Sequence, residues 1–107
     1  MRSSRPLFEL GQIVKTKSID ESVEPSKIAS LIRNHITGDF GILENTYIDD
    51  NKDAIQNGER VLSAYMVQGK KVYIITEWDR SVTTVLFADK SGRKVFENKG
   101  FKGISTD

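Results

Sequence analysis

Residues 74–87, IITEWDRSVTTVLF, hold the side chains of this sequence that are best suited to chemistry. Two apolar segments flank a turn of unusual composition, since tight turns mostly use Gly, Asn or Pro. Its residues are Glu77, Trp78, Asp79, Arg80 and Ser81. An arginine can hold a phosphate or carboxylate with two parallel hydrogen bonds, and nearby carboxyl and hydroxyl groups can move protons. These residue types predict a site for an anion or a proton, whereas spacing alone favours an ordinary charged hairpin tip.

The only histidine, His35, forms a second candidate group with Asp39 in the stretch RNHITGDFG. A histidine beside a carboxylate can act as a general acid or base near neutral pH. His35 also falls in the last turn of a predicted helix, where the helix dipole favours a cation. Spacing alone favours this second interpretation, a helix-end histidine followed by a turn aspartate.

Several other kinds of site are excluded by what the sequence lacks. It has no cysteine, which excludes disulfides, thiol nucleophiles and thiolate zinc sites. Neither a phosphate-binding glycine loop nor a serine-nucleophile motif occurs. The segment from Asp49 resembles a calcium loop, but Ala54 and Arg60 stand where that loop needs glycine and glutamate. We therefore expect neither a metal site nor a cofactor.

The composition indicates one globular domain over residues 1–107. Hydrophobic residues make up 37% and charged residues 29%, and a net charge of +1 does not indicate nucleic-acid binding. No apolar run approaches the length of a membrane span, and the first residues lack the apolar core of a signal peptide. We expect a soluble, cytoplasmic protein without a membrane partner, with an ordered core over residues 7–97 and a flexible tail over residues 98–107.

The spacing of apolar residues predicts an α+β fold that would position both candidate groups. We expect a strand at residues 12–16, a helix at residues 24–36 and a second helix at residues 45–57. A three- to four-stranded antiparallel meander follows, with strands in RVLSAYMV, KVYIITE and SVTTVLF and a further one in SGRKVFE. The helices are expected to pack on one face of this sheet.

Strand pairing would bring three hydroxyl groups together near the turn. A hairpin loop at Gly69-Lys70, with glycine first, sets Ser63 opposite Thr76. The next turn sets Thr76 opposite Thr83. Because side chains alternate along a strand, these three hydroxyls would line one face of the sheet.

The C-terminal stretch GRKVFENKGFKG interleaves basic residues with Phe96 and Phe101. Such a pattern can follow a nucleic-acid backbone and stack on its bases. An edge strand guarded by lysines explains the same residues and is favoured.

Two motifs of the sequence resemble those of a known group of proteins. The segments at residues 35–41 (HITGDFG) and 58–87 (GERVLSAY to SVTTVLF) are similar to H-x-x-G-D-W-G, G-x-R-x-L-S-x-Y and I-T-E-x-D-R-x-x-T-T-x-L. These patterns are typical of a family of short, plasmid-related bacterial proteins encoded on plasmids and integrative elements. The sequence departs from the family at Phe40, where tryptophan is usual, and at Ala88, where proline is usual. From Ala88 it continues for twenty residues where the family soon ends.

The resemblance implies that the polar residues of both candidate groups belong to one functional surface. The family patterns include His35, Gly38, Asp39, Glu77, Asp79, Arg80, Thr83 and Thr84. The predicted binding surface consists of His35, Asp39, Glu77, Trp78, Asp79, Arg80 and Thr83.

The setting of the resembled family predicts a mobile-element accessory protein that acts by binding. Its partner would be a host protein or nucleoprotein complex, in particular a defence nuclease of the CRISPR or restriction type. The absence of a complete catalytic motif favours this hypothesis over an enzyme.

Two alternatives remain open at this point. Helices followed by an antiparallel meander are similar to the layout of barnase and of RelE-like toxins, which are metal-independent ribonucleases. In that hypothesis His35 is the acid or base, Arg80 holds the phosphate of RNA, and Thr83 or Thr84 donates a hydrogen bond to it. The third hypothesis is a structural or regulatory module that forms a homodimer through a sheet edge.

Overall fold

The computed structural model describes residues 5–43 and 45–88 and confirms an α+β fold. Three helices and a four-stranded sheet follow in the order β1 (Gln12–Lys15), α1 (Lys17–Ser22), α2 (Pro25–Ile36), α3 (Asn45–Asn57), β2 (Val61–Val67), β3 (Lys70–Thr76) and β4 (Val82–Phe87). The predicted strand and both predicted helices are confirmed to within a residue or two. The predicted strand at residues 91–97 and the tail at residues 98–107 lie outside the described residues.

Helix α1 is an element that the sequence did not predict. Its six residues contribute one buried apolar side chain, Ile19, so no helical periodicity is visible. Thr16 caps the helix, because its hydroxyl accepts a hydrogen bond from the backbone N–H of Ile19 at 3.4 Å. The helix is therefore set by its cap and by one buried contact.

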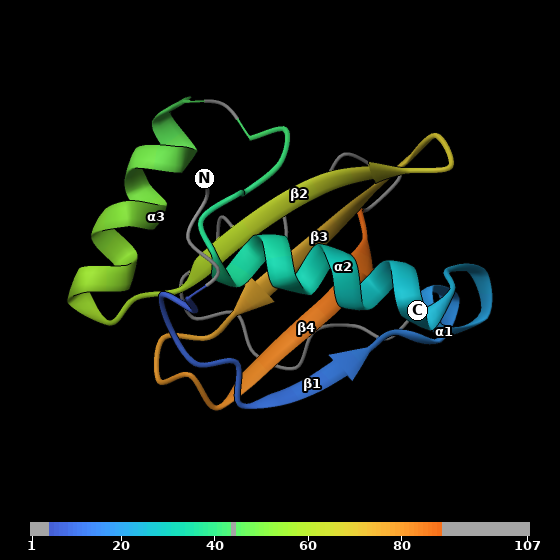
Figure 1. The fold of residues 1–107 in the computed structure, drawn as a ribbon, viewed down its shortest axis with the longest axis horizontal. Coiled ribbons are helices and arrows are strands. Elements are labelled where there is room, and N and C mark those ends of the chain that lie inside the picture. Colours follow the sequence, from blue (N-terminus) through green and yellow to red (C-terminus); the bar gives the residue numbers. More distant parts are fainter. Residues whose placement is uncertain (1–4, 44, 89–107) are drawn as a thin grey trace.

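The sheet has the strand order β1-β4-β3-β2 and is mostly antiparallel (Figure 1). Strands β2, β3 and β4 form the predicted meander, whereas β1 pairs with β4 in parallel. The pairing of Thr76 with Thr83 across β3 and β4 confirms the predicted register there.

The register of the first hairpin differs from the prediction by two residues. Its loop is Gln68-Gly69, with φ values of 53° and 78°, and not Gly69-Lys70. Both central residues thus take the left-handed conformation that a tight hairpin turn with the proper twist requires. Ser63 consequently faces Ile74 rather than Thr76. A shift by two residues keeps every side chain on its face, so Ser63 and Thr76 still share one.

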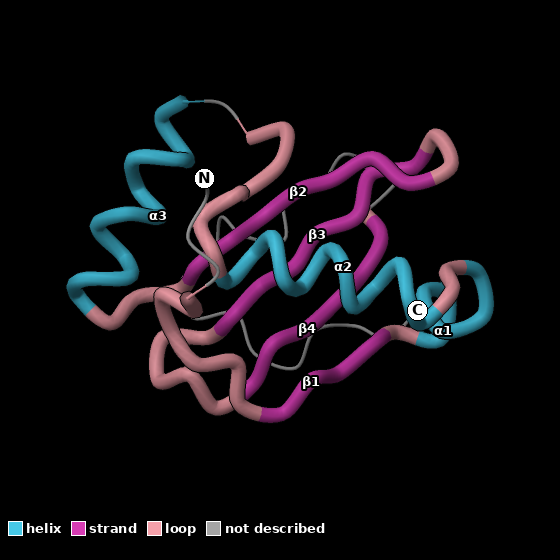
Figure 2. Tube along the Cα trace, in the orientation of Figure 1, coloured by secondary structure: helices cyan, strands magenta, loops and turns pink. Residues whose placement is uncertain are grey.

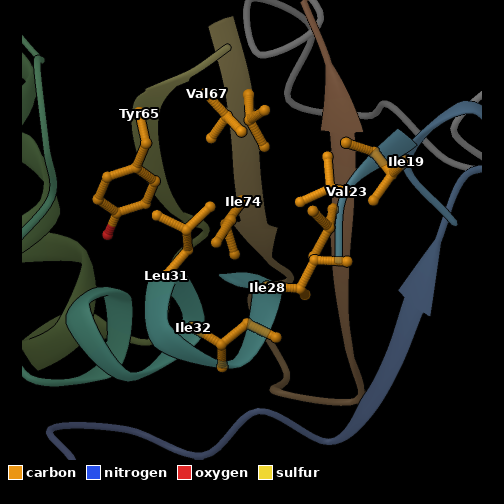
Figure 3. Close-up of a cluster of buried hydrophobic side chains, with 10 residues drawn as sticks. Ile19, Val23, Ile28, Leu31, Ile32, Tyr65, Val67 and Ile74 are labelled. Atoms are coloured by element: carbon orange, nitrogen blue, oxygen red, sulfur yellow. The ribbon is translucent and has the colours of Figure 1, made fainter. Parts of the chain in front are cut away.

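One face of the sheet packs against α1 and α2 (Figure 2). Helix α2 thus lies on the face as predicted, whereas the second predicted helix, α3, does not join this layer (Figure 1). Figure 3 shows the apolar contacts in this layer, where side chains of the two helices meet those of strands β2 and β3. The cluster consists of Ile19, Val23, Ile28, Leu31, Ile32, Tyr65, Val67, Val72, Ile74 and Val85. Pro25 suits the first turn of α2, where its missing N–H costs nothing.

Helix α3 lies beside β2 rather than over the sheet (Figure 1). Its buried Asn51 joins the free edge of β2, because the side-chain oxygen accepts from the Leu62 N–H at 3.0 Å and the side-chain N–H donates to the Leu62 carbonyl at 2.5 Å. The segment around Gly41 covers the next position, where the Ile42 N–H donates to the Ala64 carbonyl at 2.8 Å. The β2 edge is thereby closed at Leu62 and Ala64 by an amide side chain and a loop.

The helices of residues 5–43 and 45–88 are all too short or too polar to cross a membrane.

Candidate functional site

The predicted row of hydroxyls exists, and it continues through the imidazole of His35. Ser63 Oγ lies 2.6 Å from His35 Nδ1, and Thr76 Oγ1 lies 2.9 Å from His35 Nε2. Thr76 Oγ1 and Thr83 Oγ1 are 2.8 Å apart, and the Thr83 hydroxyl donates to the Leu10 carbonyl at 2.7 Å. A continuous hydrogen-bonded chain thus runs from β2 through α2, β3 and β4 to the segment before β1; we call it the His35 chain.

The direction of the protons in the His35 chain is fixed by its last member. The Leu10 carbonyl can only accept, so Thr83 uses its single proton there and must accept from Thr76. Thr76 then has no proton left for His35 and accepts from its Nε2–H. In a neutral imidazole Nδ1 is then the acceptor, and the Ser63 hydroxyl donates to it. The chain thus places a proton on Nε2 of His35, and every polar group in it is satisfied.

The environment of His35 keeps it neutral. Burial, together with the smaller effect of the positive charge of Arg80, lowers the pKa of His35 from 6.5 to about 3. The Phe8 ring meets the imidazole edge-on, with ring centroids 5.1 Å apart. The guanidinium of Arg80 lies over the same Phe8 ring, 5.5 Å from its centroid. No carboxylate bonds to either ring nitrogen, so nothing compensates a charge on His35.

The His35 chain lies in the core of the protein rather than on its surface. His35, Ser63, Thr76 and Thr83 each have 0% of their surface exposed. The second candidate threonine, Thr84, points to the opposite face of the sheet, because neighbouring strand residues alternate. The structure thus brings His35 and Thr83 into one network, and it places Thr84 and Asp39 outside that network.

Asp39 holds the turn that follows α2. Its side chain accepts from the Gly41 N–H at 3.2 Å, and its backbone carbonyl accepts from the Tyr65 hydroxyl at 2.6 Å. Burial raises the pKa of Tyr65 well above its ordinary value of 10.0, so the phenol keeps its proton. Both ring nitrogens of His35 bond to hydroxyls, so the predicted pairing of His35 with Asp39 is not formed.

Arg80 uses its guanidinium to tie the β3–β4 turn to the end of α3. Nη1 donates to the carbonyls of Glu59 at 2.6 Å and Glu77 at 3.0 Å, and Nη2 donates to the Ala54 carbonyl at 3.1 Å. Ala54 lies in the last turn of α3, where the backbone carbonyls have no hydrogen-bond partner within the helix. The backbone of Arg80 has a φ of 59°, a conformation that residues other than glycine rarely take. The turn thus holds Arg80 in a strained conformation, and the guanidinium contacts offset that cost.

The other turn residues divide into a paired group and an exposed group. Glu77 forms an ion pair with Arg60 at 3.2 Å, with both side chains largely shielded from solvent. Asp79 accepts from both the hydroxyl and the N–H of Ser81, at 2.6 and 3.1 Å, and these hydrogen bonds lower the pKa of Asp79. The Trp78 side chain is 64% exposed, the largest value among the big hydrophobic residues of the described chain.

Some residues that matter in this region escaped the sequence analysis. Ser63 belongs to the predicted hydroxyl row but was not a candidate site residue, and Asn51 was not a candidate either. The signal for Asn51 was its place between Ile48 and Ala54 on the apolar side of a weakly amphipathic helix. No sequence signal identifies the Leu10 carbonyl, because it contributes through its backbone.

Comparison with known proteins adds no further assignment. No protein-family model matches the sequence, and no match was found among curated proteins or among solved structures. Within residues 5–43 and 45–88, no group of three or more His, Asp or Glu side chains is placed to hold a metal ion.

Proposed function

We propose that the protein acts by binding a macromolecular partner through the β3–β4 turn, with Trp78 as the main contact and Asp79 beside it. The observation that carries this proposal is the exposure of Trp78, 64%, on a turn whose other residues are held in place. Large aromatic side chains that contribute most of the binding energy are typical of protein interfaces.

The turn is well ordered before any partner arrives. The Glu77 N–H donates to the Val82 carbonyl at 3.0 Å, and the Arg80 N–H donates to the Glu77 carbonyl at 2.9 Å. Together with the three guanidinium contacts and the Asp79–Ser81 pair, these bonds fix the backbone on both sides of Trp78. A preorganised contact residue loses little conformational entropy on binding, which favours affinity.

The charge of the turn favours a protein over RNA as the partner. Asp79 is fully exposed, and its lowered pKa keeps it ionised at neutral pH. An exposed carboxylate repels a phosphate backbone, whose neutralisation by cations dominates binding to nucleic acids. An indole next to a carboxylate fits an apolar pocket bordered by cationic side chains. Nuclease surfaces that hold nucleic acid present such cations, which is consistent with a host defence nuclease of the CRISPR or restriction type as the target. The mobile-element setting itself rests on the motif resemblance.

The ribonuclease alternative receives less support from the geometry. It needs His35 to exchange a proton with a substrate, yet the side chain has 0% exposure and a pKa of about 3. It also needs Arg80 to hold a phosphate, yet its Nη atoms donate to three backbone carbonyls. Substrate would have to disrupt the core to reach His35.

The proposal is tested with three tagged forms: wild type, Trp78→Ala and the control Ile42→Ala. Ile42 is 51% exposed and lies on the loop along β2, so its truncation removes a similar apolar surface elsewhere. We expect a stoichiometric, nuclease-resistant protein complex from host lysate with the wild type and Ile42→Ala forms, and its loss with Trp78→Ala. DNA cleavage by the purified partner should be inhibited by the wild type and by Ile42→Ala, but not by Trp78→Ala.

Equal capture by Trp78→Ala and wild type would contradict the proposed contact. Cleavage of labelled RNA by the wild type, lost in a folded His35→Gln form, would favour the ribonuclease instead.

A further inference from the structure

The centre of the second face of the sheet, opposite α2, is buried like that of the first. Strand alternation and the observed register place one set of side chains there: Leu62, Ala64, Met66, Lys71, Tyr73, Ile75, Thr84 and Leu86. Leu62, Ile75 and Leu86 form a buried cluster at its centre, with exposures of 6%, 0% and 5%. Met66 and Lys71, at one end of this face, are exposed.

The burial along the strands indicates that the centres of both faces are covered. An antiparallel sheet with one face in water shows buried and exposed residues in alternation. Strand β4 instead has four consecutive buried residues at its centre, and β2 begins with five. These runs are typical of a sheet that lies between two layers.

The described elements supply only one of these two layers. Helices α1 and α2 pack on the first face, and α3 lies beside β2 (Figure 1). Among residues 5–43 and 45–88, the partly buried residues that pack against the Leu62–Ile75–Leu86 cluster are Leu43 and Tyr73. Tyr73 belongs to the sheet itself, so Leu43 is the partly buried apolar side chain that this part of the chain contributes from outside the sheet. The cluster spans three neighbouring strands, about 10 Å across, which is more than one leucine covers.

We propose that the chain's own C-terminal segment, residues 89–107, forms the second layer by packing Phe96 and Phe101 over Leu62, Ile75 and Leu86. The segment starts in the right place, because Ala88 still donates to the Lys71 carbonyl at 2.9 Å at the exposed end of this face. It is also long enough, since nineteen residues can span about 60 Å and the face is about 20 Å long.

The composition of the segment fits a covering layer. Val95, Phe96, Phe101 and Ile104 are apolar, and the residues between Phe96 and Ile104 are otherwise polar, charged or glycine, which suits a solvent-facing side. Burying two phenylalanines on an apolar face is favourable, since each ring removes a large apolar area from water. The segment also begins where the sequence departs from the resembled family, so the covering layer would be a feature of this chain. This inference is independent of the role proposed for Trp78.

The test uses the full chain in solution and needs no partner. In a sample labelled with ¹³C and ¹⁵N, we expect nuclear Overhauser contacts between the rings of Phe96 and Phe101 and the methyl groups of Leu62, Ile75 and Leu86. A mixture of labelled and unlabelled protein distinguishes contacts within one molecule from contacts between two copies. Contacts within one molecule support the proposal. Contacts only between copies, or none to these methyl groups, overturn it and leave a second copy or another partner as the covering layer.

A second measurement uses trypsin, which cleaves after the five basic residues of the segment: Lys90, Arg93, Lys94, Lys99 and Lys102. The double variant Phe96→Ser/Phe101→Ser should be cleaved there at least about tenfold faster than wild type, because undocking exposes the backbone. The control Leu7→Ser removes a half-exposed apolar side chain outside the segment and should leave this rate unchanged. Equal rates for the double variant and wild type would contradict the docking of these two rings.

Discussion

Acidification should destabilise this protein well above the pH at which its carboxylates titrate, because His35 is buried without a charge partner. The pKa of His35 is about 3 in the folded protein and 6.5 in the unfolded chain. As the pH falls below 6.5, the unfolded chain binds a proton that the folded protein cannot accept. The stability that His35 contributes is thus complete above pH 6.5 and is lost progressively down to about pH 3.

The magnitude follows from the two pKa values. One unit of pKa difference corresponds to about 1.4 kcal/mol, so lowering the pH from 7 to 5 should reduce the free energy of unfolding by about 2 kcal/mol. At pH 4 the loss should reach about 3 kcal/mol. Asp79, whose pKa is lowered from 3.8, contributes only as the pH falls through that lower range, so the interval from pH 7 to 5 reports mainly on the histidine.

The assay is urea unfolding at pH 7, 6 and 5, followed by far-UV circular dichroism. A loss of about 2 kcal/mol shifts the urea midpoint by about 1 M for a chain of this size. The control variant His35→Gln keeps one donor and one acceptor at this position but does not titrate, so its stability should be nearly independent of pH over this range. A wild-type midpoint that stays constant from pH 7 to 5, or one that falls equally in His35→Gln, would refute the reasoning.

Three further substitutions test how the site is held, each measured by urea unfolding at pH 7. Asn51→Ala should lower the free energy of unfolding by about 2–3 kcal/mol, because it leaves the buried N–H and carbonyl of Leu62 without partners; no loss would mean that water replaces the amide. Gly41→Ala should cost more than about 3 kcal/mol, since its φ is 80° and a Cβ would lie 1.9 Å from the Ala64 carbonyl oxygen; a mild effect would show that the loop can move away from β2. Arg80→Ala and Arg80→Gly both remove the guanidinium contacts, but the glycine form should be more stable by about 1 kcal/mol because Arg80 has a φ of 59°; equal stability would argue against backbone strain there.

The elements were predictable where the sequence carries a strong period or a strong turn signal. Helix α2 has apolar residues at helical spacing and Pro25 at its start, and Gly38 follows its end. The β3–β4 register followed from one turn of fixed length. The β2–β3 loop was misplaced, because the prediction put glycine in the first loop position. In the structure Gln68 takes that position, in a left-handed conformation that glutamine rarely adopts.

The residues of the site could be predicted from the sequence, but their burial could not. Alternation along the strands was enough to group Ser63, Thr76 and Thr83 on one face, since alternation survives a shift of two residues. Whether that face points to water or to a helix depends on how α2 packs, and no local pattern specifies it. A lone histidine at a helix end looks the same in sequence whether it is exposed or buried, so the burial of His35 could be seen only in the fold.

The motif residues that suggested a functional surface acquire a structural explanation from these contacts. His35 and Thr83 belong to the His35 chain, Asp39 holds the turn after α2, Glu77 pairs with Arg60, and Arg80 ties the β3–β4 turn to α3. Each of these roles depends on the residue type, so the pattern need not reflect a shared active site.

Trp78 differs from these motif residues, because it falls at the unspecified position of the pattern I-T-E-x-D-R. The residues of fixed type would then form a scaffold, and the residue between them would be free to match a particular partner. On this argument Trp78→Ala should abolish binding and change the free energy of unfolding by less than about 0.5 kcal/mol, as is usual for an exposed side chain. A large loss of stability in Trp78→Ala would place this residue in the scaffold as well and would remove the main reason for treating it as the contact.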